Sequence, residues 1–452
     1  MINDIDGREA LGVSSIRSVR ATPLRRVAMA SFVGTAIEYY DFFIYGTAAA
    51  LVFPDVFFPD LGPTVGMVAS FAAFAAAFFA RPLGAAFFGH FGDQIGRKKT
   101  LVVILVTMGM STVAVGLVPS TASIGIAAPL ILVTLRLLQG FAVGGEWAGA
   151  ALLSAEYAPH GKRGTYGMFT QLGVGAGSVL ATGVFLVINF TIGEQSRTFM
   201  TWGWRLPFLL SAVLVLIAFY VRLNIAETPV FVAESARNAT SKAPLRELLD
   251  SQLRQVMLAA GVMLAPFTFG FLGGTYLLGY ANTEIGHPRN LVLGVGMLSG
   301  LAVMVFIALS ARLCDTLGRR RIILFGLALA LPWSAAVFPL IDTGSPVLFA
   351  VDMVVTPAIL GVTFGPLAAF IPEIFATRYR YTGAGLALNL GGIFGGAVPP
   401  VIAGALLATL GSWAVGLMMA MTAVVSLICA YLLPETMGSA LDPSERFAPA
   451  SA

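Results

Sequence analysis

The residues best suited to chemistry in this chain are three charges set in very apolar surroundings. Glu38 and Asp41 stand in "IEYYDFF", and their spacing of three places both on one face of a helix. Two nearby carboxylates in a low dielectric resist ionising together, which suits one of them to hold and release a proton. Arg136, in "LRLLQG", offers a planar fork of donors that fits a carboxylate. The alternative for Asp41 and Arg136 is a static ion pair that fixes helix packing.

The composition indicates which elements position these charges. Of 452 residues, 57% are hydrophobic and 11% are charged, whereas a soluble domain has about 25% charged residues. A helix needs roughly 20 apolar residues to cross a bilayer. The sequence therefore predicts an all-α membrane protein with twelve transmembrane helices, near residues 27–53, 64–88, 101–118, 124–153, 165–190, 204–224, 255–281, 290–311, 322–341, 346–371, 383–408 and 412–433.

The longest polar interruption divides the chain into two similar halves. Of the 27 Lys and Arg residues, three fall in outer loops and two within spans if the N-terminus is inside, which leaves 22 on the cytoplasmic side. This bias predicts that both termini are cytoplasmic in a cell (plasma or inner) membrane. The expected organisation is a cytoplasmic tail, a six-helix bundle, a cytoplasmic loop, a second bundle and a cytoplasmic tail, at 1–26, 27–224, 225–254, 255–433 and 434–452.

The two halves repeat one another in order. "GHFGDQIGRKK" at 89–99 returns 222 residues later as "ARLCDTLGRRR", and "EYAPHGKRG" at 156–164 returns 217 residues later in "EIFATRYRYTG". Glycines of the fifth and eleventh spans match at an offset of 218. Three ordered matches indicate a duplicated six-span unit, and an even number of spans makes the repeat parallel. Parallel repeats of this kind imply alternating access to a site between the halves.

The repeated charged turn is predicted to form a cytoplasmic gate. Its glycines permit a tight reversal, and its aspartate is expected to lie against the N-terminus of a neighbouring helix, where negative charge is favoured. The alternative is a signal for topology alone. The gate candidates are Gly89, Asp93, Gly96, Arg97, Glu156, Arg163, Asp315, Gly318, Arg319, Glu373 and Arg380.

Three further charges fall within the spans. Arg81 and Glu146 lie at equal depth near the cytoplasmic ends of spans two and four, which predicts an inner-leaflet pair, most simply a structural brace. Asp352 is the only intramembrane charge of the second half, and it either faces the substrate or is wetted at the interface. The three histidines and two cysteines are too scattered for a metal site, and no cofactor is expected. A net charge of +4 argues against nucleic acid as a partner.

Several of these motifs together resemble a known family. "GHFGDQIGRKK" is similar to the signature of the major facilitator superfamily, and "RLLQGFAVGGEW", "EYAPHGKRG", "GWRLPF" and "RYTGAG" narrow the resemblance to its metabolite:proton symporters. That family includes carriers of shikimate, proline and betaine, and α-ketoglutarate. The resemblance implies the twelve-helix major facilitator fold and a substrate site between the halves. Candidate substrate-binding residues are Arg136, Tyr39 and Asn389, the last standing where related carriers are expected to have glutamine.

The function predicted most directly is proton-coupled symport of a small organic acid or zwitterion by alternating access. Asp41 and Glu38 would couple protons, and the partners would be the substrate, protons and the lipid bilayer. A proton-coupled efflux antiporter is the alternative, since the same fold supports it. A membrane enzyme would need a nucleophile and base or metal ligands, and neither pattern is present in the sequence. A sensor would need a sizeable soluble domain, whereas the longest polar segment, 225–254, has about 30 residues.

Overall fold

The computed structural model describes residues 24–193, 196–223 and 244–438, and within them the secondary structure is entirely helical. The first half contains α1 (Leu24–Leu51), α2 (Phe53–Phe57), η1 (Pro59–Leu61), α3 (Gly62–Ile95), α4 (Arg97–Leu117), α5 (Thr121–Ile124), α6 (Ala127–Val143), α7 (Glu146–Tyr157), α8 (Arg163–Thr191), α9 (Arg197–Thr201), η2 (Gly203–Arg205) and α10 (Leu206–Leu223). The second half contains α12 (Pro244–Phe271), η3 (Leu272–Tyr276), α13 (Leu277–Thr283), α14 (Arg289–Leu317), α15 (Arg319–Ile341), α16 (Pro346–Phe364), α17 (Leu367–Ile374), η4 (Thr377–Tyr379), α18 (Arg380–Gly392), η5 (Ile393–Ala397), α19 (Val398–Leu410) and α20 (Ser412–Leu432).

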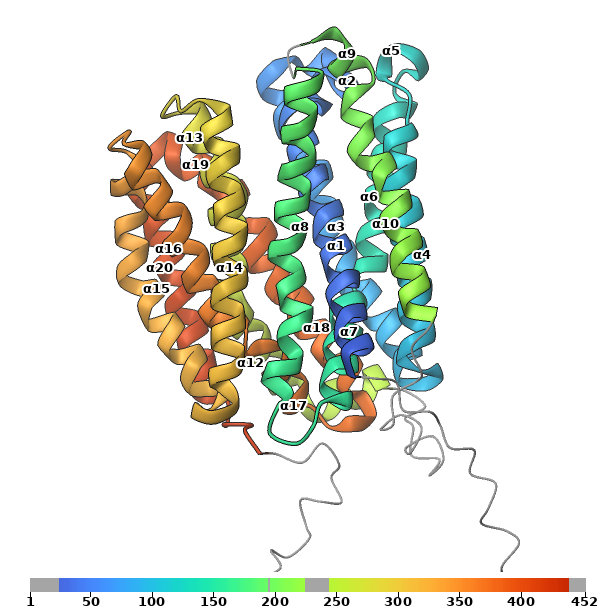
Figure 1. The fold of residues 1–452 in the computed structure, drawn as a ribbon, viewed down its shortest axis with the longest axis vertical. Helices are drawn as coiled ribbons and strands as arrows, with labels where there is room; N and C mark the ends of the chain where they lie inside the picture. Colours follow the sequence, from blue (N-terminus) through green and yellow to red (C-terminus); the bar gives the residue numbers. More distant parts are fainter. Residues whose placement is uncertain (1–23, 194–195, 224–243, 439–452) are drawn as a thin grey trace, which may run out of the picture.

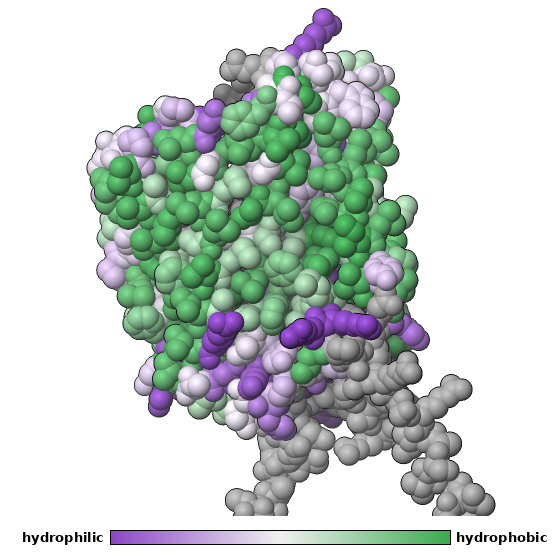
Figure 2. Space-filling view, viewed as in Figure 1, coloured by the Kyte–Doolittle hydropathy of each residue, from purple (hydrophilic) through white to green (hydrophobic). Residues whose placement is uncertain are grey.

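Twelve helical segments of the described chain are long and apolar enough to cross a membrane, which confirms the predicted number of spans. On the face seen in Figure 2, apolar residues cover the middle of the molecule, and hydrophilic residues lie mainly toward its ends. Such an apolar surface matches hydrocarbon because lipid tails cannot solvate polar side chains. The seventh span begins about ten residues earlier than expected, because the end of the predicted loop 225–254 is helical and kinks at Gln252. The rest of that loop, residues 225–243, lies outside the described residues, as do most of both predicted tails.

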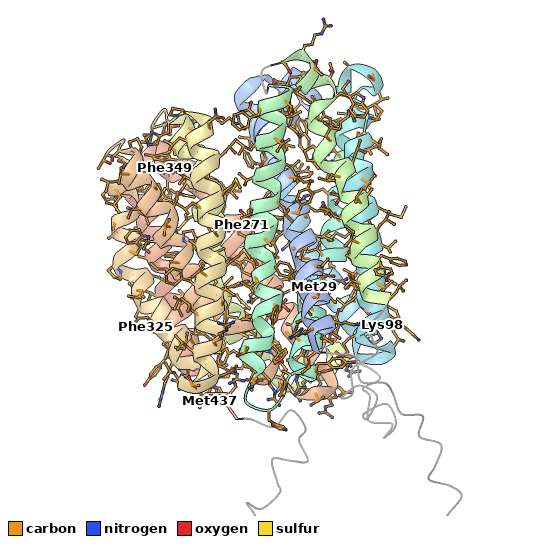
Figure 3. The ribbon with its side chains drawn as sticks, in the orientation of Figure 1. Met29, Lys98, Phe271, Phe325, Phe349 and Met437 are labelled. Carbon is orange, nitrogen blue, oxygen red and sulfur yellow. The ribbon has the colours of Figure 1, made fainter. Side chains whose placement is uncertain are left out.

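The helices of the two halves stand beside one another (Figure 1), and they meet mainly where α8 packs on α14 and α3 packs on α18. The turns that carry Asp93 and Asp315 lie at the same end of the molecule, which we call the motif end. Lys98 and Met437 also lie toward the motif end, whereas Phe349 lies near the opposite end and Phe271 lies between the two sets of helices (Figure 3). The duplicated turns therefore meet at one face of the bundle.

Two spans are broken at equivalent positions. The fourth span divides into α6 and α7 at Gly144, and the tenth divides into α16 and α17 at Gly365, which is 221 residues later. A side chain at either glycine would collide with a neighbouring helix: a Cβ would lie 2.1 Å from the carbonyl oxygen of Arg81 or from the hydroxyl of Ser310, respectively. The breaks therefore occur where helices approach too closely for any residue larger than glycine. The repeat seen in the sequence extends to this local geometry.

The closest approach within the first half predicts a stability effect. A Cβ at Gly84 of α3 would lie 1.8 Å from the backbone oxygen of Phe141, and backbone cannot move aside as a flexible side chain can. We expect Gly84→Ala to destabilise the protein by on the order of 1–3 kcal/mol, as overpacking does. The measurement is thermal unfolding of the purified protein in detergent. The control is Gly183→Ala in α8, where no atom lies within 4 Å of the Cβ position. Equal stability of the two variants would contradict the close packing of α3 on α6.

Candidate functional site

Asp41 lies at the centre of a buried polar network built from four helices of the first half. Its side chain accepts hydrogen bonds from Ser211 of α10 at 2.6 Å and from Thr112 of α4 at 2.7 Å. Thr112 in turn accepts from the amide of Gln139 at 2.7 Å, and Gln139 accepts from the guanidinium of Arg136 at 2.5 Å. Each group donates toward Asp41, so the network is a head-to-tail chain from a positive to a negative charge. Chains of this kind polarise one another and strengthen each bond.

Arg136 does not pair directly with Asp41, because Gln139 and Thr112 lie between them. Its guanidinium carbon lies 4.0 Å from the ring centroid of Tyr45 and 4.9 Å from that of Phe74, which are cation–π distances. The Nε and Nη2 atoms of this buried side chain have no hydrogen-bond partner. A static ion pair between Asp41 and Arg136, the alternative that the sequence left open, is absent from the described contacts. Arg136 instead keeps donor capacity that its protein neighbours leave unused.

Glu38 and Asp41 are both on α1, but their side chains have different neighbours. Asp41 bonds to α4 and α10, whereas the charges that act most strongly on Glu38 are Arg81 of α3 and Glu146 of α7. Arg81 stacks over Phe78, with its guanidinium carbon 4.4 Å from the ring centroid. The Oε2 atom of Glu38 is buried without a hydrogen-bond partner. The two carboxylates therefore occupy neighbouring but different environments.

The predicted pair of Arg81 and Glu146 is wrong. Glu146 forms an ion pair with Arg222 of α10, which also donates to the backbone oxygen of Leu101 at 2.6 Å. The sequence count placed Arg222 with the cytoplasmic residues, because it stands at the end of the sixth span. In the structure Arg222 is 4% exposed, and its long side chain reaches back between the helices. Depth along a span indicated the correct layer but could not choose between two arginines.

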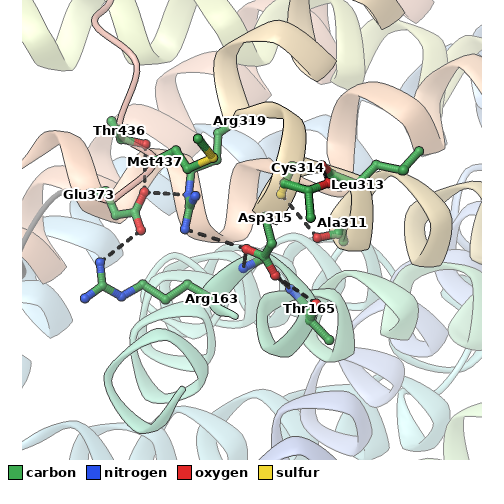
Figure 4. Close-up of polar contacts among 12 residues, drawn as sticks. Arg163, Thr165, Ala311, Leu313, Cys314, Asp315, Arg319, Glu373, Thr436 and Met437 are labelled. Carbon is green, nitrogen blue, oxygen red and sulfur yellow. Dashed lines mark hydrogen bonds and ion pairs between the residues drawn. The ribbon is translucent and has the colours of Figure 1, made fainter. Parts of the chain in front are cut away.

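The aspartates of the two repeated turns each bind the first turn of a helix from the opposite half. Asp93 accepts from the backbone N–H and hydroxyl of Thr382, at 3.2 and 3.0 Å, at the start of α18. Asp315 accepts from the backbone N–H groups of Gly164 and Thr165 and from the Thr165 hydroxyl, all at 2.8 Å, at the start of α8 (Figure 4). Helix N-termini present unpaired N–H groups and a partial positive charge, so both contacts are favourable. The two contacts are related by the repeat.

Ion pairs reinforce these contacts. Within the first half Arg97 pairs with Glu156 at 3.3 Å, and within the second half Arg319 pairs with Glu373 at 2.7 Å. Arg163 of the first half also pairs with Glu373 at 3.3 Å, so one carboxylate holds cations of both halves (Figure 4). The structure thus brings these predicted gate residues together at the motif end.

The remaining gate candidates shape the turns. Gly96 and Gly318 have φ angles of 110° and 104°, which residues with a side chain rarely adopt. Gly89 permits the approach of α18, since a Cβ there would lie 2.8 Å from the Cα atom of Thr382. Arg380 donates through Nε to the backbone oxygen of Phe375 at 3.2 Å. The glycines therefore serve the turns and the contact between halves.

A small cavity lies between the halves, lined by residues that include Tyr39, Ser178, Phe267, Ser299 and Phe364. Its volume is about 60 Å³. Ligand pockets usually measure roughly 300–1,000 Å³, so the cavity must widen to hold a metabolite. Tyr39 thus lines this cavity, and its role in substrate binding stays a prediction.

Asn389, the substrate-binding candidate of the second half, is not among the described residues that line this cavity. Its amide donates to the backbone oxygen of Gly144 in the opposite half and to that of Gly385 in its own helix, each at 2.7 Å. Asn389 therefore holds the break of the fourth span against α18, and its role in substrate binding stays a prediction.

Sequence reasoning missed the uncharged members of the network, Thr112, Gln139 and Ser211. A signal for them exists, because each is a polar residue inside a span, and Gln139 follows Arg136 by three residues on one helix face. Polar residues in a span usually face the protein interior. What the sequence lacks is the information that all three face the same carboxylate.

The corrected ion pair gives a test. Glu146→Gln leaves Arg222 buried without its counter-charge, and we expect it to lower stability by about 3–5 kcal/mol. Adding Arg222→Gln should restore much of that loss, because both charges are then gone. Adding Arg81→Gln instead should restore none. Thermal unfolding of the three purified variants distinguishes the cases, and recovery in the Arg81 double variant would reinstate the pair predicted from the sequence.

Comparisons with known proteins agree with this architecture. The model of the Major Facilitator Superfamily matches residues 31–399. An inner membrane metabolite transport protein of Escherichia coli (strain K12) is 43% identical over 421 residues, covering 92% of this chain and 95% of that protein. The shikimate transporter of the same organism is 38% identical, covering 86% and 89%, respectively. A proline/betaine transporter of Salmonella typhimurium is 34% identical, covering 84% and 77%.

A solved structure shows the same fold. The proton:xylose symporter bound to 6-bromo-6-deoxy-D-glucose superposes with a TM-score of 0.73 at 18% identity, and the match covers 92% of this chain and 97% of that one. The relatives are transporters rather than enzymes, and the family resemblance inferred from the motifs is confirmed. The chain therefore belongs to the major facilitator superfamily, as a twelve-span secondary transporter of metabolites in the cell membrane.

Proposed function

We propose that this transporter is a proton-coupled symporter that takes up a small carboxylated metabolite. The observation that carries the proposal is the buried chain of hydrogen bonds that joins Arg136 to Asp41 through Gln139 and Thr112. It links a group able to hold a proton to a group able to bind a carboxylate. Both termini and the motif end are assigned to the cytoplasm because Lys and Arg residues concentrate there.

Protonation of Asp41 changes what Arg136 can bind. As a carboxylate, Asp41 is the negative end of the chain and balances the guanidinium through two intervening groups. When Asp41 takes up a proton, the chain loses that negative end, and the buried positive charge of Arg136 is left uncompensated. An uncompensated buried charge is costly, so an anionic group is drawn to the free Nε and Nη2 donors. Proton and anion therefore bind together, as symport requires.

The substrate class follows from the geometry of Arg136. A guanidinium with two free donors fits a carboxylate, and the stacked Tyr45 and Phe74 rings hold its plane in place. Shikimate, proline and betaine, after which these relatives are named, all carry a carboxylate. They are the first compounds to assay. Glu38 and Arg81 form a second acid–base set beside this one, available to pass the proton onward.

The contacts at the motif end serve as the cytoplasmic gate in this proposal. With Asp93 and Asp315 both bonded to helices of the opposite half, that side is closed. Each contact is worth about 0.3–1 kcal/mol in dipole energy, so the set biases the equilibrium between states without locking it. Opening toward the cytoplasm requires both aspartates to leave their helix N-termini, and the cavity near Tyr39 then widens to that side.

Asp41→Asn tests the proton-coupling role. Asparagine imitates the protonated form and cannot release a proton, so we expect loss of accumulation driven by an inward proton gradient. Exchange between preloaded proteoliposomes and the medium should survive, because it needs only the loaded carrier to reorient. Both assays are run on the same reconstituted variant with shikimate, proline and glycine betaine. The control is Asp342→Asn, a carboxylate bonded to Tyr280 and Ser412 near the opposite end.

The outcomes separate the alternatives. Full accumulation by Asp41→Asn would remove Asp41 from proton coupling. A wild type that accumulates substrate only when the proton gradient is directed outward, so that substrate and protons move in opposite directions, would support the efflux antiporter. If a correctly folded Asp41→Asn variant lost both accumulation and exchange, Asp41 would be assigned to substrate binding instead.

Arg136→Lys tests the substrate class. An ammonium keeps the charge but cannot form the two-point contact, so we expect affinity for a carboxylated substrate to fall by at least about tenfold, the loss of one charge-assisted hydrogen bond. Binding is measured by calorimetry on the purified variant, with unfolding temperature as the control for folding. An affinity within twofold of the wild type would reduce Arg136 to a helix brace.

A further inference from the structure

The second half buries a carboxylate that has no cation. Asp352 of α16 is fully buried, which excludes the wetted interface that the sequence left open. Its Oδ1 atom accepts from the hydroxyl of Thr356 at 3.1 Å, whereas Oδ2 has no hydrogen-bond partner. No ion pair among the described residues involves it. One oxygen of this acid is therefore held by the protein, and the other is left open.

The buried acids of the first half, unlike Asp352, lie near arginines. Away from the motif end, the spans of this half bury three acids, Glu38, Asp41 and Glu146, and each is bonded to or near one of the buried arginines Arg81, Arg136 and Arg222. Asp352 has no such balance. An isolated ionised carboxylate in a dry interior costs far more than a neutral one, so the buried form must carry a proton. Ionisation requires that water or a cation reach Oδ2.

The surroundings of Asp352 suit a proton better than a metal ion. Thr356 already accepts from the indole N–H of Trp333 at 2.7 Å, so its hydroxyl is committed to donating to Asp352. Within the described residues no group of three or more His, Cys, Asp or Glu side chains is placed to hold a metal. The Thr275 hydroxyl of the π-helical turn η3 is buried without a partner. Two unsatisfied oxygens thus lie in neighbouring elements, since η3 packs against α16.

The turn η3 connects Asp352 to the contact between the halves. A Cβ at Gly273 would lie 2.8 Å from the methyl group of Thr356, so η3 is in close contact with the residue that donates to Asp352. The residue before η3, Phe271, packs on Phe42 and Phe78 of the first half, with ring centroids 4.9 and 5.3 Å apart (Figure 3). A movement of α16 or η3 that admits water to Asp352 therefore also disturbs the aromatic contact between halves.

The other titratable groups near this end, including the exposed Glu284 after α13, form no hydrogen bond with Asp352. Tyr280 of α13 donates to Asp342 at the end of α15 at 2.6 Å, and Tyr276 of η3 stacks on Tyr280. His287, on the loop before α14, lies against Phe349 of α16 with ring centroids 5.3 Å apart. The acidic residues of α12 and α14 stand near the motif end. None of these groups is hydrogen-bonded to Asp352.

We propose that Asp352 is a second proton-binding site, which takes up and releases a proton as η3 and the contact around Phe271 rearrange during transport. The inference rests on the proposed proton coupling and adds to it a site in the second half, whose buried Arg319 and Arg380 lie at the motif end and form no ion pair with Asp352. Asp41 responds to substrate through Arg136. Asp352 responds to the conformation of the second half, because only a rearrangement exposes its open oxygen.

Infrared spectroscopy of the protein in liposomes tests protonation without a known substrate. We expect the wild type to show the carbonyl stretch of a buried protonated acid at mildly acidic pH, and to lose it in mildly alkaline buffer. Because a protonated Asp41 contributes a component of its own to this band, only the Asp352 component should be absent from Asp352→Asn at every pH, and it should remain in Asp41→Asn and Asp342→Asn. Asp342 is the matched control, because it is an exposed carboxylate with two hydrogen bonds. A band that Asp352→Asn leaves unchanged, or an Asp352 band that never disappears with pH, would overturn the proposal.

Transport stoichiometry supplies the second measurement. Proton and substrate uptake are recorded together in proteoliposomes, with shikimate, proline and glycine betaine as probes. Asp352→Asn should still accumulate substrate but should carry about half as many protons per substrate, whereas Asp41→Asn should not accumulate it. An unchanged ratio in Asp352→Asn would refute the second site and leave the symport proposal intact. Absence of proton coupling in the wild type would refute the proposed function, and the infrared band would still decide whether Asp352 titrates.

Discussion

A charge inside a hydrocarbon layer must be compensated by the protein, because no water is present to solvate it. Every polar feature of this transporter depends on that constraint. The buried acids of the first half lie beside arginines, and Asp41 reaches its arginine through a chain of hydrogen bonds. One amide, of Gln139, and one hydroxyl, of Thr112, complete that chain. The same constraint makes a protonation event consequential, because removing one charge leaves another uncompensated.

At the motif end the constraint is satisfied across the two halves instead of within one. Asp93 and Asp315 each accept backbone N–H groups from a helix of the other half, and Glu373 pairs with arginines from both. These contacts combine a helix terminus that needs an acceptor with an acid that needs donors. Close approach is possible because glycines remove side chains at the crossings, as at Gly89. Separation of the halves at this end would therefore remove the helix N-termini from both aspartates, whereas the pairs Arg97–Glu156 and Arg319–Glu373 lie within one half each.

The repeat is close in geometry but unequal in chemistry. Both halves have the turn, the ion pairs and the broken span, since these maintain the fold and the gate. Away from the motif end, the buried arginine–acid sets belong to the first half, whereas the second half has the π-helical turns η3 and η5 and the isolated Asp352. A π-turn disturbs regular helical pairing and is common at functional sites. The two halves therefore share one scaffold and differ in the buried charges that they carry.

The sequence by itself determined the number of spans, the repeat and the charged turns, and it indicated which charges lie inside the spans, apart from Arg222. It did so because bilayer thickness sets helix length and because the cost of burying charge makes each exception visible. The tertiary structure alone decided the partners. Arg222 rather than Arg81 pairs with Glu146, and Thr112, Gln139 and Ser211 gather around Asp41. A linear sequence gives depth along a helix, but partners depend on how each helix is rotated about its axis and which neighbour it faces, and only packing sets those.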